Sequence, residues 1–417
     1  MNKIKSIKGT YDILPGDVET WQFVEDTVRK WMRIYACFEI RTPIFEQTSL
    51  FARSIGEDTD IVGKEMYTFT DMGSRSLTLR PEGTASVIRS FIEHSLDQRG
   101  LPQNLWYMGP MFRQERPQKG RQRQFHQFGV EMVGSASPMT DVQAMALFDS
   151  IAGDLGLDER MYSINSLGGD DSREAYRSAL VAFLDSVEDR LCEDCKRRKG
   201  TNPLRVLDCK NPGCNEAVHD SENLPKSVDS LTEDDRSYYD AVKKLLEESG
   251  IAFEEDPFLV RGLDYYTGVV FEMKYTGLGA QSAIMGGGRY NKLIKQLGGP
   301  DLPAVGFACG MERLVMVMQA NDNVKSQAVD VYVVNSGTDV DTKALRYVMK
   351  LRKQGNSAAT DHLGRSVKAQ MRTASKLNVR YVLFPEEGEG QVGIRNMERS
   401  DQETLPFEEF LTIVKNN

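Results

Sequence analysis

The stretch FRQERPQKGRQRQFHQFGVEMVG, which runs from Phe112 to Gly134, decides the fold of this chain. It predicts two strand-like arms around a basic loop, with Arg113 and Glu115 on the first arm. Because side chains on a strand alternate between its faces, Gln127 and Glu131 point the same way on the second arm. This layout favours a phosphate-binding site, since the planar guanidinium groups suit phosphate oxygens.

The second arm has one mixed, polar face and one mostly apolar face. The polar face carries Phe125, Gln127, Gly129 and Glu131. The apolar face carries His126, Phe128, Val130 and Met132. The glycine in the polar face predicts a gap where a ligand approaches the backbone. The alternative is a surface hairpin whose charges are only solvated, so other segments must decide.

Length and composition limit the class of protein. With 417 residues and 40% hydrophobic content, two or three domains with sizeable cores are expected. No stretch approaches the roughly 20 apolar residues of a membrane span, and the N-terminus lacks the apolar core of a signal peptide, so a cytoplasmic protein without membrane contact is predicted. Six cysteines favour reduced thiols over a disulfide scaffold, and the net charge of −9 argues against nucleic-acid binding through overall charge.

A local basic region nevertheless lies near the C-terminus. From Lys343 to Arg380 there are ten Lys or Arg residues and one acid, Asp361. Eight of the basic residues fall at helical spacing, as Lys343, Arg346, Lys350 and Lys353 and then as Arg365, Lys368, Arg372 and Lys376. Two basic helix faces predict an RNA-binding surface, with a merely solvated surface as the alternative.

The elements around those helices predict a compact α/β domain at 329–417. Their order is a strand at Ala328–Val334, a helix, a short strand, a helix, a strand at Val379–Phe384, a strand QVGIRNM and a final helix. The domain boundary is expected in the polar segment Asn321–Gln327, which follows a long apolar helix.

That apolar helix, in AVGFACGMERLVMVM, begins near Gly310 and contains an arginine that does not fit its core stripe. The stripe consists of Met311, Leu314, Val315 and Met318. Arg313 lies at the start of the helix, where anionic ligands are favoured, so it is a candidate nucleotide contact. Snorkelling of an arginine from a core helix is the alternative.

A further arginine, Arg261, opens the segment RGLDYYTGVVFEM, which precedes the glycine cluster MGGGRY at Met285–Tyr290. Glycine clusters alone are weak evidence, because they also serve tight turns and close backbone packing. Tyr265 and Tyr266 also fit an apolar core. Only the combination of this segment with the others points to a ligand site.

Four segments carry a resemblance to one protein family. They are FEIRTPIFEQTSLF with Pro43, the FRQER to VEMVG hairpin, RGLDYYTG with MGGGRY, and GFACGMERLVMV. The first, second and fourth resemble the three motifs of class II aminoacyl-tRNA synthetases. The third resembles the pair of segments that is specific to the histidine enzyme. Over essentially its whole length, the chain therefore resembles the bacterial histidyl-tRNA synthetases.

This resemblance implies an architecture. We expect an α+β class II catalytic domain, an antiparallel sheet flanked by helices, at 1–170 and 230–322. A helical insertion at 171–229, which contacts the tRNA acceptor arm in the family, and a C-terminal α/β anticodon-binding domain at 329–417 complete the chain. The segment around Pro43 implies a homodimer.

The resemblance also implies a reaction. ATP activates L-histidine to histidyl-adenylate with release of pyrophosphate, and the histidyl group then moves to tRNA(His), leaving AMP. Magnesium is expected beside the outer phosphates of ATP. No proofreading domain is expected, because a pocket of buried hydrogen-bonding groups rejects substrates that lack them.

The resemblance also implies roles for individual residues. For ATP, the catalytic residues Arg113 and Arg261 are expected at the α-phosphate and Arg121 at the terminal phosphate. The adenine is expected between Phe125 and Arg313, with Glu115 at its edge. For histidine, Glu82 and Thr84 with Gln127 are expected at the ammonium group, and Glu131 and Tyr266 at the imidazole, with Tyr265 beside them. Pro81, Glu82 and Thr84 also suit a capped helix start, and both interpretations can hold together.

The insertion contains LCEDCKRRKGTNPLRVLDCKNPGC, which brings four cysteines close to zinc-site spacing. The candidate ligands are Cys192, Cys195, Cys209 and Cys214. The first pair has the usual two intervening residues, whereas the second has four. The resemblance neither requires nor forbids a metal, so Zn²⁺ and reduced thiols in a loop both stay open.

Three other functions compete with tRNA charging. The main rival is a catalytically inactive synthetase-like paralogue that binds histidine and regulates histidine biosynthesis. Such a protein has no need of Arg113, Arg261 and Arg313 together with Phe125, nor of a basic C-terminal domain. A class II enzyme for another amino acid is disfavoured by RGLDYY and Glu131. A nonenzymatic RNA-binding protein leaves the phosphate arginines unexplained.

Overall fold

The computed structural model describes residues 3–56, 59, 61–117, 120–275, 283–320, 329–335, 342–385 and 390–415. The chain divides into two compact units, Met1–Val324 and Lys325–Asn417. The predicted boundary segment, Asn321–Gln327, lies outside the described residues. Each unit has its own sheet and its own apolar core.

The first unit is built on a large sheet. Among the described residues its strands, in sheet order, are β1 (Phe38–Glu39), β5 (Gln103–Phe112), β6 (Gln124–Val133), β11 (Ala304–Gly310), β10 (Ala283–Arg289), β9 (Val269–Tyr275), β7 (Arg160–Ser166) and β8 (Phe253–Glu255). Pairing from β5 through β7 is antiparallel, and only the edge strands β1 and β8 pair in parallel. The predicted antiparallel sheet is therefore confirmed, with two short parallel edges added.

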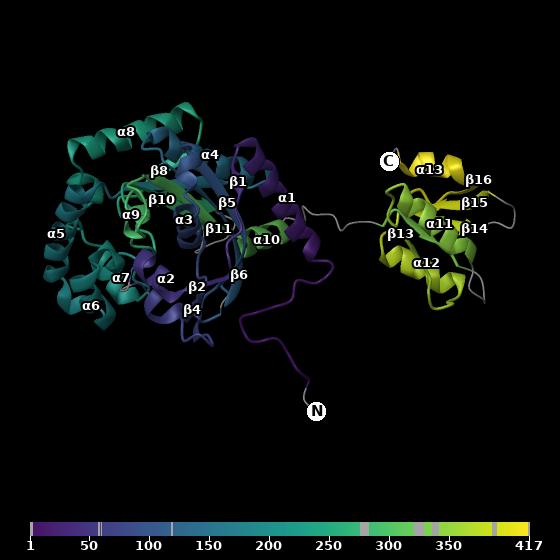
Figure 1. Ribbon diagram of the computed structural model, residues 1–417, viewed down its shortest axis with the longest axis horizontal. Coiled ribbons are helices and arrows are strands. Elements are labelled where there is room, and N and C mark those ends of the chain that lie inside the picture. The colour runs from purple at the N-terminus through teal and green to yellow at the C-terminus, as the bar shows by residue number, and fades with distance from the viewer. Residues whose placement is uncertain are drawn as a thin grey trace. The chain divides into compact units, whose positions relative to one another are not determined.

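One face of this sheet is covered by long helices. They are α1 (Val18–Ile34), α4 (Pro138–Asp154), α8 (Glu233–Glu248) and α10 (Met311–Ala320) (Figure 1). Phe128, Phe148 and Phe307 contact one another in this core through stacked and edge-on rings. The predicted alternation of β6 is confirmed here, because Phe128, Val130 and Met132 all pack in this core. The apolar stripe of α10 is buried as expected.

The other face packs on α3 (Thr84–Glu93) and α9 (Leu293–Gln296). This second core contains Tyr107 of β5 and the tyrosines Tyr265, Tyr266 and Tyr290. A small sheet lies beside it, in the order β2 (Phe45–Gln47), β4 (Ser76–Leu79), β3 (Thr68–Thr70), with α2 (Thr48–Ile55) and a π-helical turn at Ile61–Glu65. The candidate site forms on this face.

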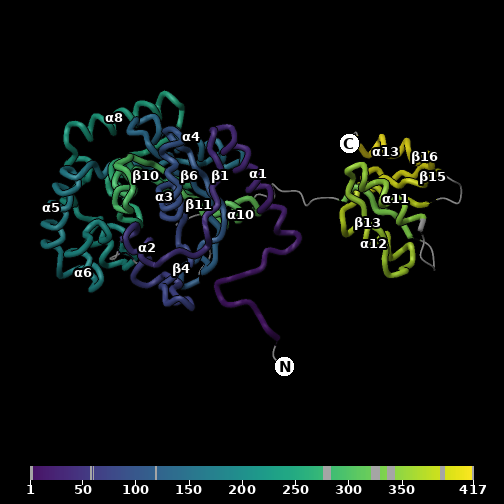
Figure 2. Tube along the Cα trace, viewed as in Figure 1, coloured from purple at the N-terminus to yellow at the C-terminus, as the bar shows by residue number. Residues whose placement is uncertain are grey.

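The hairpin that opened the sequence differs from its prediction at one point. Strand β5 ends at Phe112, so Arg113 and Glu115 lie in the loop rather than on a strand arm. One more hydrogen bond, from the Arg113 N–H to the Arg123 carbonyl at 2.9 Å, continues the pairing past the strand. The Arg123 N–H turns away to the Gly9 carbonyl at 2.8 Å, so the ladder ends here. Gly9 belongs to the extended N-terminal segment, which is purple in Figure 2.

Between β7 and α8 the chain forms the helical insertion. Its described helices are α5 (Asp170–Ser186), α6 (Glu193–Thr201) and α7 (Pro212–His219), joined by short 3-10 turns at Glu188–Arg190, Pro203–Val206 and Ser227–Ser230. They gather at one side of the sheet, away from α1 and α10 (Figure 1). The insertion has a small core of its own, to which three of its cysteines contribute.

The second unit has a five-stranded sheet within its described residues. In sheet order its strands are β13 (Ala358–Thr360), β12 (Val331–Val333), β14 (Tyr381–Pro385), β15 (Gln391–Asn396) and β16 (Gln402–Pro406). Its helices are α11 (Thr342–Lys353), α12 (Val367–Lys376) and α13 (Phe407–Lys415). The first strand is shorter than predicted, Ala328 lies outside the described residues, and β16 was not predicted at all.

The basic helix faces of this unit need one correction. Arg365 precedes α12, and its guanidinium is held by the buried Asp361 at 2.5 Å, so it does not belong to the helix face. The remaining basic residues of the two faces, on α11 and α12, are exposed. No helix among the described residues of either unit is long and apolar enough to cross a membrane.

Candidate active site

A cavity of about 180 Å³ opens on the α3 side of the large sheet. Eight of the residues predicted from the sequence line it: Glu82, Thr84, Arg113, Gln127, Glu131, Arg261, Tyr265 and Tyr266. They come from four separate stretches of the chain, namely the start of α3, the β5–β6 hairpin, β6 itself and the segment before β9. The fold therefore brings the predicted histidine residues and both phosphate arginines to one site.

One end of the cavity is a buried carboxyl group. Glu131, on β6, is 1% exposed and accepts hydrogen bonds from the Thr84 hydroxyl at 2.8 Å and from the Tyr290 hydroxyl. Burial raises the pKa of Glu131 to about 8, and the nearby Glu82 adds to the rise, whereas the two hydroxyl donors oppose it. Without a bound partner, this environment therefore favours the protonated form of the carboxyl group.

Glu82 has a structural task beside the cavity. Its carboxylate accepts the backbone N–H groups of Thr84 at 2.6 Å and Ala85 at 2.8 Å, in the first turn of α3. The predicted capped helix start is thereby confirmed. Burial also raises the pKa of Glu82. Because the same side chain lines the cavity, its contact with a substrate ammonium stays a compatible prediction.

The other end of the cavity carries the two arginines. Arg113 donates through Nε to the Pro81 carbonyl at 2.9 Å, and its guanidinium lies 5.2 Å from the centre of the Phe125 ring. Arg261 donates through Nη1 to Glu272 Oε2 at 2.7 Å. These contacts orient both guanidinium groups.

Two buried polar atoms of the lining have no hydrogen-bond partner among the described residues. They are Arg261 Nε, a donor, and Gln127 Oε1, an acceptor. A buried polar atom without a partner is costly, and in a cavity it marks a position where a ligand supplies the missing group. The pair fits a ligand that offers both an acceptor and an N–H donor.

Glycines on the neighbouring strands make room for these side chains. A Cβ on Gly286 of β10 would overlap Arg261 Nη2, and a Cβ on Gly306 of β11 would overlap Glu131 Oε2. The MGGGRY cluster thus serves close packing against the site rather than a turn. The gap expected at Gly129 is wrong, because the Tyr107 hydroxyl fills it, 2.5 Å from the place of a Cβ.

The remaining residues predicted for ATP lie outside the cavity lining. Arg121 Nη1 is 3.2 Å from Glu115 Oε2, so these two pair in the hairpin loop. Arg313, in the first turn of α10, donates to the Ala283 carbonyl, and burial lowers its pKa, with nearby Arg121 adding to the effect. The group that covers Phe125 in this structure is the Arg113 guanidinium, not Arg313.

Two residues of the site were not singled out from the sequence, although both lie in quoted segments. Tyr290 follows the glycine cluster and binds Glu131. Glu272 lies on β9 opposite Gly286 and holds Arg261. Alternation along β9 was the available signal for Glu272, whereas Tyr290 had none. The neighbouring Arg289 is structural, since it forms a buried ion pair with Asp141 of α4.

This fold and site define a class II aminoacyl-tRNA synthetase. Two oriented arginines and a buried carboxyl group line one cavity on the face of an antiparallel sheet, and an α/β unit with basic helices follows. The family model for histidyl-tRNA synthetase matches residues 9–314, and the model for the anticodon binding domain matches residues 330–417. The chain belongs to the histidyl-tRNA synthetase family.

Similar proteins agree over almost the whole chain. The histidine–tRNA ligase of Syntrophotalea carbinolica is 49% identical, over 97% of this chain and 96% of the relative. That of Thermosipho melanesiensis is 47% identical, over 95% of each. The crystal structure of the apo histidyl-tRNA synthetase of S. aureus is 37% identical, with a TM-score of 0.81, and the match covers 99% of this chain and 100% of that one. The chain is an enzyme that joins histidine to tRNA at the expense of ATP, rather than the regulatory paralogue.

Proposed function

We propose that the cavity holds histidine with its imidazole at Glu131 and its carboxylate directed to Arg113 and Arg261. One observation carries this orientation: a buried carboxyl group with two hydroxyl partners and a pair of fixed arginines line the same cavity. The imidazole N–H matches the carboxyl, and the negative charge of the substrate matches the guanidinium groups.

In this orientation the chemistry needs no enzyme nucleophile. An oxygen of the histidine carboxylate attacks the α-phosphorus of ATP, the new P–O bond forms, and the bond to pyrophosphate breaks. Negative charge grows on the oxygens of the α-phosphate during the attack. Arg113 and Arg261 stabilise that charge, and their contacts with Pro81 and Glu272 hold them in place before ATP arrives.

At the imidazole end, Glu131 is the acceptor, and Tyr266 and Tyr265 complete the wall of the cavity. Because its pKa is raised, the Glu131 carboxyl group is protonated more readily than an exposed one. To accept an imidazole N–H it therefore releases its proton, to solvent or to the imidazole. Gln127 Oε1, Thr84 and Glu82 are assigned to the substrate ammonium group. The unpartnered Gln127 oxygen supports that assignment.

Around this cavity, Glu115, Arg121, Phe125 and Arg313 are assigned to ATP. Arg121 pairs with Glu115 and lies near Arg313, which supports a polyphosphate path along the hairpin loop. Magnesium accompanies the outer phosphates and neutralises part of their charge. The adenine takes the place of the Arg113 guanidinium on the Phe125 ring and stacks there against Arg313, while the Pro81 contact keeps Arg113 beside the α-phosphate.

The chain's other assignments follow from tRNA charging. Residues 1–170 and 230–322 act as the catalytic domain, 171–229 as the insertion at the acceptor arm, and 329–417 as the anticodon-binding domain for tRNA(His), in the cytoplasm. Exposed basic residues on α11 and α12 support the last contact.

The segment around Pro43 forms a homodimer interface in this proposal. Phe38, Ile44 and Phe45, beside Pro43, are 67%, 43% and 51% exposed. Such apolar exposure supports a partner surface. Light scattering across a range of concentrations tests this interface. The molar mass of the wild-type protein should be that of a dimer, and Phe38→Asp should shift the equilibrium to monomer. A wild-type monomer at every concentration would contradict it.

Histidine-dependent exchange of pyrophosphate into ATP tests the assignment of the arginines. Replacing Arg261 with His should lower the exchange rate by about 10³-fold or more, because a group that acts like an arginine finger is lost. Histidine binding, measured by calorimetry, should persist. The control is Arg346→His, on an exposed face of α11 in the second unit, which should leave the exchange unchanged. An unchanged rate in the Arg261 variant removes its catalytic assignment.

A further inference from the structure

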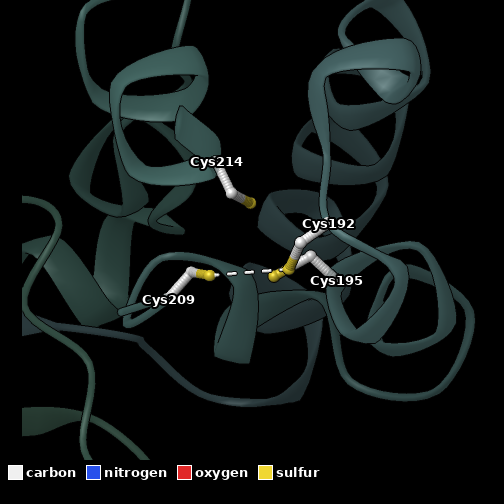
Figure 3. A group of neighbouring side chains, drawn as sticks. All are labelled: Cys192, Cys195, Cys209 and Cys214. Atoms are coloured by element: carbon white, nitrogen blue, oxygen red, sulfur yellow. Dashed lines mark hydrogen bonds between the residues drawn. The ribbon is translucent and has the colours of Figure 1, made fainter. Parts of the chain in front are cut away.

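Four cysteine side chains of the insertion point toward one another (Figure 3). Their Sγ atoms all lie within 4.8 Å of one another, and those of Cys192 and Cys209 are 3.8 Å apart. Cys195, Cys209 and Cys214 are buried, and Cys192 is partly exposed. Cys192 and Cys195 come from the start of α6, and Cys209 and Cys214 from the turn into α7, so two separate loops converge on one point.

The spacing of the sulfurs matches a tetrahedral metal site. Zinc–sulfur bonds of about 2.3 Å place four tetrahedral sulfurs about 3.8 Å apart, which is the Cys192–Cys209 separation. A disulfide requires sulfurs at about 2.0 Å, so this is not a cluster of disulfides. We propose that Cys192, Cys195, Cys209 and Cys214 bind one Zn²⁺ ion as thiolates.

The backbone around the cysteines is arranged to support thiolate charge. The Asn211 N–H donates to Cys209 Sγ at 3.4 Å. The Asn211 side chain caps α7 by accepting the Cys214 N–H at 3.2 Å, which fixes the turn between the second pair. Cys192 is the N-cap residue of α6, and Cys214 lies in the first turn of α7, where helix dipoles favour negative charge. The four-residue spacing of the second pair is thus accommodated by a capped helix start.

The insertion has a physical need for such an ion. Beyond α5 it consists of short helices and turns around a small core, and a core of that size contributes little stability alone. Buried thiols without a metal would act only as small apolar groups. A bound zinc ion ties the α6 and α7 loops together with far more free energy than this packing.

The loop that the metal closes also contacts the active site. Between the two cysteine pairs, Asn202 Nδ2 donates to Asp264 Oδ1 at 2.7 Å, and Arg205 donates to the Gly262 carbonyl and lies 3.7 Å from Asp264. Gly262 lines the cavity, and Tyr265 and Tyr266 follow in the same segment. The zinc ion therefore positions this wall of the histidine site from outside, a role that rests on the proposed function of the cavity.

Metal analysis of untagged, full-length protein purified without chelator tests the site itself. Mass spectrometry of the metals should find about one zinc per chain. The double variant Cys209→Ser, Cys214→Ser should lose it, whereas Cys37→Ser, which changes a buried cysteine of the main core, should keep it. If the double variant does not fold, cobalt exchange into wild-type protein decides: a thiolate-to-cobalt charge-transfer band with the intense visible bands of a tetrahedral site is expected. Folded wild-type protein without zinc and without that cobalt spectrum overturns the proposal.

Replacing Arg205 with Gln tests the link to the cavity. Zinc content should stay at about one per chain, while the KM for histidine in the exchange reaction rises several-fold, up to about tenfold, with a smaller change in kcat. An unchanged KM overturns the positioning role and leaves the metal site in place. Failure of the proposed function is distinct, since wild-type protein would then show no histidine-dependent exchange whatever its zinc content.

Discussion

The candidate-site cavity and the four-cysteine cluster are held together in opposite ways. The cavity joins residues that are far apart in sequence, such as Glu82, Glu131 and Arg261. Strand register positions Glu131, the start of α3 positions Glu82, and a contact with Glu272 of β9 positions Arg261. The cluster joins residues within 192–214, and short loops set their positions. The fold therefore forms the first site before any ligand binds, whereas in our proposal a zinc ion holds the loops of the second.

This difference has consequences for tolerance to change. In the cavity, backbone and side chains interlock so closely that two glycines admit no Cβ. Around the cluster, a Cβ on Gly200 or Gly213 meets no atom closer than 3.8 Å. Small substitutions should therefore disable the cavity and leave the cluster intact, while loss of metal should disrupt the cluster and, through the Asn202 and Arg205 contacts, disturb only one wall of the cavity.

Among the changes that contrast these two regions, Gly286→Ala should have the largest effect. The new Cβ occupies the place of Arg261 Nη2, and because that atom ends a flexible side chain, the guanidinium moves while the sheet persists. A displacement of about 1 Å in a positioning group costs about 10²-fold in rate. Histidine-dependent pyrophosphate exchange should fall by that factor or more, with zinc content and thermal unfolding near those of wild type.

The matched control is Gly200→Ala, in the last turns of α6, where a Cβ meets nothing within 4 Å. It should leave both the exchange rate and the zinc content unchanged. If Gly286→Ala keeps full activity, the packing of Arg261 against β10 does not set the catalytic geometry, and the contrast between the two regions fails.

A smaller effect is expected at the imidazole end, for Glu131→Gln. The amide keeps the size and one acceptor oxygen but loses the charge, and a charge-assisted hydrogen bond contributes about 1.5–3 kcal/mol. The KM for histidine should rise by about 10- to 100-fold, and the KM for ATP should stay within about twofold.

The control for this variant is Glu216→Gln, at an exposed position on α7 beside the cysteine cluster, which should match wild type in both constants. An unchanged histidine KM in Glu131→Gln would show that the carboxyl charge does not recognise the imidazole.

Features with a local signal were predictable from the sequence. The period-2 alternation of 124–133 placed Gln127 and Glu131 on the cavity side of β6, and cysteine spacing identified the cluster. The resemblance added Arg261 and Glu82, and the helix-capping role of Glu82 was also visible from its neighbours. The antiparallel sheet that the resemblance implied is confirmed by the pairing of β5, β6, β11, β10, β9 and β7.

Features without an apolar pattern, and features that depend on contacts between distant segments, were not predictable. Strand β16 is a mostly exposed edge strand, QETLP, without an apolar alternation to signal it. The end of β5 at Phe112 depends on the Gly9 carbonyl, which captures the Arg123 N–H. Tyr107 fills the space at Gly129 because the two lie opposite each other on paired strands. Gly9 and Tyr107 are both distant in sequence from the residues that they contact.

The smallest expected effect concerns the pH dependence of stability, which distinguishes a buried neutral carboxyl from an ionised one. Burial raises the pKa of Glu131 from 4.5 to about 8. Below pH 4.5 both folded and unfolded chains hold the proton. As the pH rises from there, the unfolded chain releases it while the folded chain keeps it until about pH 8, so stability falls across this window.

The amide of the Glu131→Gln variant cannot titrate, so this variant should lose less stability than wild type as the pH rises. Between about pH 5.5 and 7.5 the difference is at most about 2.7 kcal/mol, the value for one proton over two pH units. Urea unfolding followed by tryptophan fluorescence measures it in the first unit alone, since Trp21, Trp31 and Trp106 all lie there. Glu82, whose pKa burial also raises, is present in both proteins, so its contribution largely cancels from the comparison. Parallel pH profiles would mean that Glu131 is already ionised in the folded protein, and that histidine meets a preformed carboxylate rather than a carboxyl group that must first release its proton.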